Sequence, residues 1–249
     1  TPCCCSWDDI QGVWDKVAPI IDYWGGDHHT EDDYDRFVAA AGPSGGPYGG
    51  GHYNDPDMIL VGNSRFPNPS PGAFAGACKF NHGCDDGNGC TAPYVSKTQP
   101  GVGCMDCGSL SHTEEQTQFG LWAIFAAPLL MSVDLRTVSN ASRQILLNDE
   151  IIAVNQDRLG RQGRRLVGGA GQVWSRPLSD GVAVALYNKN ASAPLDIAFS
   201  MAMVGFSAVT RVSVRDLYAH ADEGVFVGRY VGRAVPLHGI KMLKLTLAA

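Results

Sequence analysis

The sequence has no long hydrophobic run and no concentration of positive charge. Its longest apolar run, Leu121–Met131, is interrupted by Pro128 and is about half of the roughly 20 residues that cross a bilayer. Lysine and arginine number 19 against 25 acidic residues, for a net charge of −6, and no basic cluster is dense enough to neutralise a phosphate backbone. We therefore expect no membrane span and no nucleic-acid partner.

Glycine and proline are frequent without dominating the composition. The 30 Gly and 14 Pro among 249 residues stay below the roughly 25–30% at which a chain becomes low-complexity. The chain begins at Thr1 with no Met and no basic-then-apolar leader, so we expect a removed targeting segment or a true N-terminus elsewhere. The composition predicts a folded, loop-rich protein with one core or two smaller ones.

The eight cysteines fall into two clusters. One is Cys3–Cys5 and the other lies in a Gly/Asn/Asp-rich stretch, as Cys78, Cys84, Cys90, Cys104 and Cys107. Four of these could form a zinc site, but their spacing fits zinc modules poorly, and disulfides that tie a long loop are the favoured interpretation. Two glycosylation sequons, Asn140-Ala141-Ser142 and Asn190-Ala191-Ser192, also favour a secretory route.

Apolar residues recur at helical spacing in the first two thirds of the chain. Asp8 or Asp9 can cap a helix that runs to about residue 21, and Ser139 can begin another that runs to Leu146. Thr113 and Gln116 have the spacing of a capping box. An apolar face follows them, with Phe119, Trp122, Ala123, Ala126 and Leu130. Further segments are a short helix at 32–41, buried strands at 58–61 and 131–135, and 151–154, which fits either type.

The periodicity changes from helical to alternating after a Gly- and Arg-rich stretch at 158–171. Val182, Val184 and Leu186 alternate with small residues, and Ser179-Asp180-Gly181 is a typical hairpin turn. Two further strands are predicted at 209–217 and 241–247. The pattern predicts an α/β segment followed by a small antiparallel β module.

Two aspartates lie between a Gly-rich loop and a buried strand. In Asp55-Pro56-Asp57 the proline restricts Asp55 to an extended conformation, which fixes the two carboxylates relative to each other. Rigid carboxylates at a strand end suit sugar recognition. On these residues alone, an Asx-Pro turn that begins a strand is the alternative, as helix capping is for Asp8 and Asp9.

The segment His52–Asn63 resembles the Trp-Asn-Asp-Pro-Asp-Met…Gly-Asn signature of the α-galactosidases of glycoside hydrolase family 27. Five further stretches resemble the family in the same order and cover nearly the whole chain outside 64–108. They are Gln118–Leu135 followed by Arg136, Asn148–Gly163, Val173–Leu178, Val214–Tyr218 and Val235–Leu245.

This resemblance implies the last part of a (β/α)8 TIM barrel, followed by an all-β antiparallel sandwich. We place the barrel part at 1–165, with a Cys/Gly-rich insertion at 64–108, and the sandwich at 166–249. Family members carry the paired-Asp sugar-binding strand and the Lys-x-Asp nucleophile strand upstream of this region, and neither motif occurs here before residue 9. The resemblance thus implies a C-terminal fragment without its nucleophile.

The resemblance also implies roles for three residues. Asp9 is the expected general acid/base, because Asp9-Ile10 and Trp14 match the family spacing, with Asp8 as the neighbouring alternative. Asp57 corresponds to an aspartate that hydrogen-bonds galactose, and Met58 lines the same pocket. The chain departs from the family at Cys5, where an Arg is usual, and at Tyr53, where a Trp is usual.

The implied activity is retaining hydrolysis of terminal α-linked galactose, with α-galactosides as substrates. α-N-Acetylgalactosaminidase is an alternative, and a non-catalytic carbohydrate-binding chain is another. The chemistry requires no metal or cofactor, and we interpret Asp27, His28 and His29 as a polar loop. We expect the 249-residue chain to be inactive alone, an acidic pH optimum, and a secreted, lysosomal or vacuolar location. A homodimer of the full-length protein is compatible with the resemblance.

Overall fold

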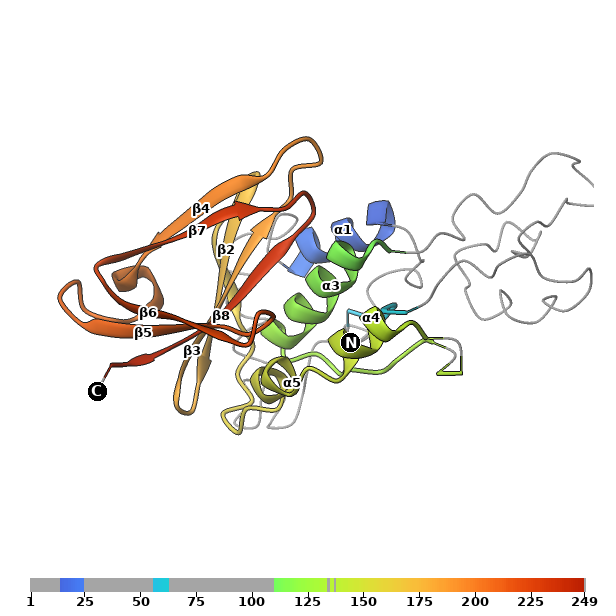
Figure 1. Cartoon of the computed structure of the whole chain (residues 1–249), viewed down its shortest axis with the longest axis horizontal. Coiled ribbons are helices and arrows are strands. Elements are labelled where there is room, and N and C mark those ends of the chain that lie inside the picture. Colours follow the sequence, from blue (N-terminus) through green and yellow to red (C-terminus); the bar gives the residue numbers. More distant parts are fainter. Residues whose placement is uncertain (1–13, 25–55, 63–109, 134, 137, 249) are drawn as a thin grey trace, which may run out of the picture.

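The computed structural model describes residues 14–24, 56–62, 110–133, 135–136 and 138–248, and these form a helical part beside a β sandwich (Figure 1). The predicted helix at 32–41 and all eight cysteines lie outside the described residues, so the disulfides remain a prediction. No described helix has the length and apolar character needed to span a membrane.

The helical part contains α1 (Trp14–Trp24), α3 (His112–Ile124), α4 (Asn140–Leu146) and α5 (Asp149–Asn155). The predicted cap of α4 is confirmed, because the Ser139 hydroxyl accepts from the Ser142 N–H at 3.0 Å. The ambiguous segment 151–154 is helical, and the Asn148 side chain caps it by accepting from the Ile151 N–H at 3.0 Å.

The capping box of α3 lies two residues earlier than the predicted pair Thr113 and Gln116. The Ser111 hydroxyl accepts from the Glu114 N–H at 3.3 Å, and the Glu114 carboxylate accepts from the Ser111 N–H at 2.7 Å. Ser111 has the extended backbone that a cap requires, whereas Thr113 is already within the first turn. The prediction was wrong because two overlapping sequence pairs fit one motif.

The helix α3 is also shorter than its apolar residues predict. It ends at Ile124, and Ala126 is left-handed with φ 53°. Ala126 and Leu130 therefore do not extend the helical face, and Leu130 is exposed. A left-handed residue directly after the last turn provides amide donors for the terminal carbonyls, which explains the stop.

The predicted strand 58–61 forms one parallel bridge, between Ile59 and Met131. Its Ile59, Leu60 and Val61 side chains are fully buried. The expected buried strand at 131–135 contributes only Met131, which is 47% exposed, while Leu135 is 62% exposed. That expectation was wrong because, within the described residues, this segment pairs with Ile59 alone, and Val133 packs only partly against the core.

The β sandwich has two antiparallel sheets (Figure 1). The larger has the order β1-β2-β3-β8-β5-β6 and the smaller pairs β4 with β7. Their bounds are β1 Arg164–Val167, β2 Gly171–Leu178, β3 Gly181–Asn188, β4 Leu195–Ser200, β5 Arg211–Asp216, β6 Ala221–Val227, β7 Arg229–Val235 and β8 Ile240–Leu247. The predicted hairpin turn joins β2 to β3, and the two predicted later strands correspond to β5 and β8.

The central strands of the larger sheet are buried on both faces. Val184 and Leu186 on β3 face the second sheet, and Ala183 and Ala185 belong to the core shared with the helices. The small residues that alternate with Val184 and Leu186 therefore make room for α3. On the helix side, Gly120 allows the same close approach, because an added Cβ there would lie 3.0 Å from the Met242 side chain of β8. The helices and the sheet thus share one continuous core.

Candidate functional site

Asp57 has an unusual backbone conformation in the segment that resembles the galactose-binding motif. Its φ is 75°, in the left-handed region that costs an ordinary residue about 1–2 kcal/mol. Its carboxylate accepts from the Met58 N–H at 2.6 Å, a local hydrogen bond that Asp can make and that helps it to tolerate this conformation. The Met58 side chain is 38% exposed. A strained, locally bonded aspartate is typical of a functional site.

One face of α3 holds this segment by its main chain. The Trp122 indole N–H donates to the Asp57 carbonyl at 2.7 Å. The Gln118 carboxamide donates to the Met58 carbonyl at 3.1 Å and accepts from the Leu60 N–H at 2.9 Å. The Glu115 carboxylate accepts from the Gly62 N–H at 2.8 Å. Because these groups are largely buried, the hydrogen bonds fix the position of Asp57 and Met58 without using either side chain.

Sequence reasoning missed Glu115 and Gln118. Both are buried residues of α3, whose first two turns are polar in sequence, and they share one helix face with Trp122 at three- and four-residue spacing. That pattern was the available signal. The Glu115 carboxylate also accepts a hydrogen bond from the Ser142 hydroxyl at 2.9 Å, so the same carboxylate connects α4 to the segment 56–62.

Asp9 lies outside the described residues, and its role remains a prediction. The described chain starts five residues later at Trp14, which stacks on His238 with ring centroids 5.2 Å apart. His238 contacts Glu114 of α3 through Nδ1 at 2.8 Å, and its carbonyl accepts from the Thr117 hydroxyl at 2.6 Å. The sandwich therefore holds the start of α1 and the start of α3 together.

Arg176 of β2 connects the family-like stretches at 148–163 and 173–178. Its side chain is fully buried. The guanidinium donates to the Ala123 carbonyl in the last turn of α3 and to the Asn155 carbonyl at the end of α5, the latter at 3.2 Å. A cation at two helix C-termini interacts favourably with the partial negative charge of the terminal carbonyls. These stretches thus form a structural joint between helices and sandwich.

Asp157 strengthens the same joint. Its carboxylate accepts from the Ser179 N–H at 2.9 Å and from the Leu159 N–H at 2.9 Å. Partial burial alone would raise the pKa of Asp157, but these hydrogen bonds and the nearby Arg176 outweigh it and hold the pKa below its usual value. Asp157 is therefore ionised over the whole neutral and mildly acidic range.

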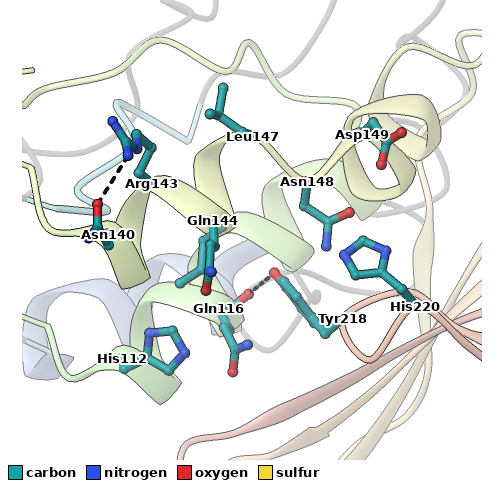
Figure 2. A pocket seen from close by; sticks show the side chains of 11 residues that line it. His112, Gln116, Asn140, Arg143, Gln144, Leu147, Asn148, Asp149, Tyr218 and His220 are labelled. Atoms are coloured by element: carbon teal, nitrogen blue, oxygen red, sulfur yellow. Dashed lines mark hydrogen bonds between the residues drawn. The ribbon is translucent and has the colours of Figure 1, made fainter.

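A groove of about 670 Å³ lies between the helices and the sandwich (Figure 2). Gln116, Gln144 and Tyr218 face its centre, and the Tyr218 hydroxyl donates to the Gln116 carbonyl at 2.6 Å. Neither Asp57 nor Met58 lines it. The groove is thus separate from the predicted galactose-binding residues.

A charged network borders this groove. Both Glu150 oxygens accept from the Arg215 guanidinium, at 2.6 and 2.8 Å, and one also contacts His220 Nδ1 at 2.6 Å. The hydrogen bonds from Arg215 lower the pKa of Glu150 to about 2, with a smaller contribution from His220 and against the effect of burial. Asp149 lies within 4.8 Å of Glu150 and His220. Because Arg215 already neutralises Glu150, we interpret this group as a structural ion pair.

The pH dependence of stability follows from Glu150. Its folded pKa of about 2 lies below the ordinary 4.5, so its contribution is complete above about pH 4.5 and is lost as the pH falls towards 2. Glu150→Gln is therefore expected to be less stable than the wild type at pH 6, with a gap that has shrunk to about a quarter of that size at pH 2.5. Urea unfolding at several pH values measures this gap. Asp157 titrates in both proteins, so its contribution cancels in the difference between their free energies of unfolding.

Two further variants test whether the pH-dependent gap comes from the pair of Glu150 and Arg215. Arg215→Met should reproduce the pH profile of Glu150→Gln, because either change removes the same pair. Leu135→Ala, at an exposed position, should keep the wild-type profile. A gap of constant size from pH 6 to pH 2.5 would contradict the assignment.

Comparisons with known proteins give the class and the family of this architecture. A family model described as "Alpha galactosidase A" matches residues 98–157, and one described as "Alpha galactosidase C-terminal beta sandwich domain" matches residues 168–245. A GH27 β-L-arabinopyranosidase from Geobacillus stearothermophilus, solved with arabinose, shares the fold with a TM-score of 0.66. It is 20% identical, and the match covers 97% of this chain and 44% of that chain. The fold is that of a glycoside hydrolase.

Curated relatives are similar over most of the chain. It is 32% identical over 217 residues to the α-N-acetylgalactosaminidase of Gallus gallus, covering 86% of this chain and 40% of the relative. It is 31% identical over 236 residues to an α-galactosidase of Oryza sativa, covering 94% of this chain and 43% of the relative. The chain belongs to the α-galactosidase family, glycoside hydrolase family 27, and spans about 40% of the length of these two relatives.

Proposed function

We propose that the complete gene product is a retaining α-galactosidase and that Asp57 and Met58 contact the galactose. The observation that supports this most is the rigid mounting of the segment 56–62 on α3, with a left-handed Asp57 beside a half-exposed Met58. The hydrogen bonds of Trp122 and Gln118 go to main-chain atoms. A preformed backbone of this kind presents a carboxylate to sugar hydroxyls in a fixed position.

The proposed reaction uses two carboxyl groups about 5–5.5 Å apart. One attacks the anomeric carbon, while the other protonates the leaving glycosidic oxygen and later takes a proton from water. We assign the proton donor to Asp9 and propose, from the family resemblance, a nucleophile in a part of the protein upstream of Thr1. The 249-residue chain alone is then expected to release no p-nitrophenol from its α-galactoside, and turnover that depends on Asp9 would contradict the assignment.

The test uses the complete gene product with p-nitrophenyl α-D-galactopyranoside and the corresponding α-N-acetylgalactosaminide. Asp57→Asn should lower kcat/KM on the galactoside about 10- to 100-fold, the value of one hydrogen bond to a charged group. Asparagine is a fair replacement because it also tolerates a left-handed backbone. Asp180→Asn is the matched control, because Asp180 lies exposed in the β2–β3 turn and pairs with Lys244.

The alternatives give different results. Faster turnover of the α-N-acetylgalactosaminide would favour the second activity, which the 32% identity to the chicken enzyme supports. Binding of galactose without turnover of either substrate would favour a non-catalytic chain. Equal activity of Asp57→Asn and Asp180→Asn would remove Asp57 from the sugar pocket.

We also propose that the protein follows the secretory route to the outside of the cell, the lysosome or the vacuole, and that disulfides tie its cysteine-rich stretch. The cysteine clustering and the two sequons support this.

A further inference from the structure

The connection between β3 and β4 contains one of the two sequons, Asn190-Ala191-Ser192, in an exposed turn. The Asn188 side chain holds the turn by two hydrogen bonds to its backbone. Its carboxamide donates to the Ala193 carbonyl at 2.9 Å and accepts from the Asn190 N–H at 2.9 Å. The turn is therefore ordered, and its outer residues, including Ala191 and Ser192, are exposed to solvent.

Within this turn the two functional residues of the sequon contact each other. The Asn190 carboxamide oxygen accepts from the Ser192 hydroxyl at 2.6 Å and from the Ser192 N–H at 2.8 Å. Because the oxygen takes both bonds, the amide nitrogen faces away from them. Within the described part of the chain, that nitrogen has no hydrogen-bond acceptor, and it is not among the buried unpaired atoms. Asn190 is partly exposed, and its amide nitrogen is thus within reach of solvent.

The second sequon has the opposite arrangement. Asn140 and Ser142 lie in the first turn of α4, and the Ser142 hydroxyl is buried against Glu115 at 2.9 Å. The Asn140 oxygen instead accepts from Arg143 at 3.1 Å. In the folded protein the Ser142 hydroxyl is bonded to Glu115 and not to the exposed Asn140, so we expect this sequon to be modified only before α4 forms.

We propose that Asn190 is a site of N-linked glycosylation, with a lipid-linked oligosaccharide diphosphate as the glycosyl donor. The amide nitrogen forms a bond to the anomeric carbon and loses a proton to the transferase, while the bond from that carbon to the diphosphate breaks and the lipid diphosphate leaves with the electron pair. This inference rests on the proposed secretory route. It is independent of the proposed hydrolase activity, so either can fail without the other.

The experiment expresses the whole chain with a secretion signal in insect cells and analyses the total cell extract together with the medium. Release of glycans by an amidase in heavy-oxygen water converts each glycosylated Asn to labelled Asp, and peptide mass spectrometry reads both sequons. We expect labelling of Asn190 in most molecules, several-fold above Asn140. Because transfer occurs in the endoplasmic reticulum, retained protein is as informative as secreted protein.

Two variants of an exposed residue make the result specific. Ser192→Ala should abolish the label at Asn190, and Ser192→Thr, which keeps the hydroxyl, should retain it. Unlabelled Asn190 in the wild type, label at Asn140 alone, or undiminished label in Ser192→Ala would each overturn the proposal.

Discussion

Arg176→Met is expected to lower the free energy of unfolding by about 3–6 kcal/mol, because it removes two buried hydrogen bonds from a charged donor at about 1.5–3 kcal/mol each. The guanidinium is fully buried and donates to the Ala123 and Asn155 carbonyls at two helix ends. Methionine fills much of the space but donates nothing, so these carbonyls lose the cation that compensates them. Urea unfolding at neutral pH measures the loss.

Two further variants separate charge from hydrogen bonding. Arg176→Lys keeps the cation but lacks the planar fork that reaches two carbonyls, so it should fall between the wild type and Arg176→Met. Arg211→Met, at an exposed position of β5, should change stability by less than about 0.5 kcal/mol. If Arg176→Met were as stable as the wild type, the desolvation of the guanidinium would cancel its hydrogen bonds and the joint would not depend on it.

Gln118→Met is expected to cost about 2–4 kcal/mol of stability, because it leaves the buried Leu60 N–H and the Met58 carbonyl without their partner. The same change should lower kcat/KM of the complete gene product on the galactoside, since Met58 and the adjacent Asp57 lose part of their mounting. Chemical denaturation and steady-state kinetics on one protein preparation measure both effects.

The neighbouring Gln116 provides the matched control on the same helix. Its side chain lines the groove of Figure 2 and does not contact the segment 56–62. Gln116→Met should therefore stay within about 0.5 kcal/mol of the wild type and keep its activity. Equal effects of the two substitutions would show that Gln118 acts through general helix stability and not through the sugar-binding segment.

The hydrophobic periodicity predicted whether most of the described elements are helices or strands. The capping residues predicted fewer of the positions at which those elements begin and end. The alternation at Val182, Val184 and Leu186 indicated β3 correctly. The small residues between them were uninformative, because nothing in the sequence shows that a helix bearing Gly120 packs on that face. The cap of α3 was misplaced because Ser111 with Glu114 and Thr113 with Gln116 both fit a capping box, and only the backbone conformation decides between them.

The candidate site was predictable in part. Asp57 could be singled out because it follows a proline and precedes a buried strand. Its left-handed backbone could not be foreseen, since it depends on Trp122, which is 65 positions further along the chain. The roles of Glu115 and Gln118 depend on other long-range contacts with the segment 56–62, and the sequence shows only their spacing on one helix face with Trp122, not their burial. The role of Asp9 still rests on the family resemblance alone.

The most direct measurement is proton NMR of the complete gene product as it hydrolyses p-nitrophenyl α-D-galactopyranoside. The spectrum shows whether galactose is released and which anomer forms first. We predict that α-galactose accumulates first and converts to the β anomer only by later mutarotation, as a double displacement with two carboxyl groups requires. β-Galactose as the first product, or no galactose at all, would contradict the account.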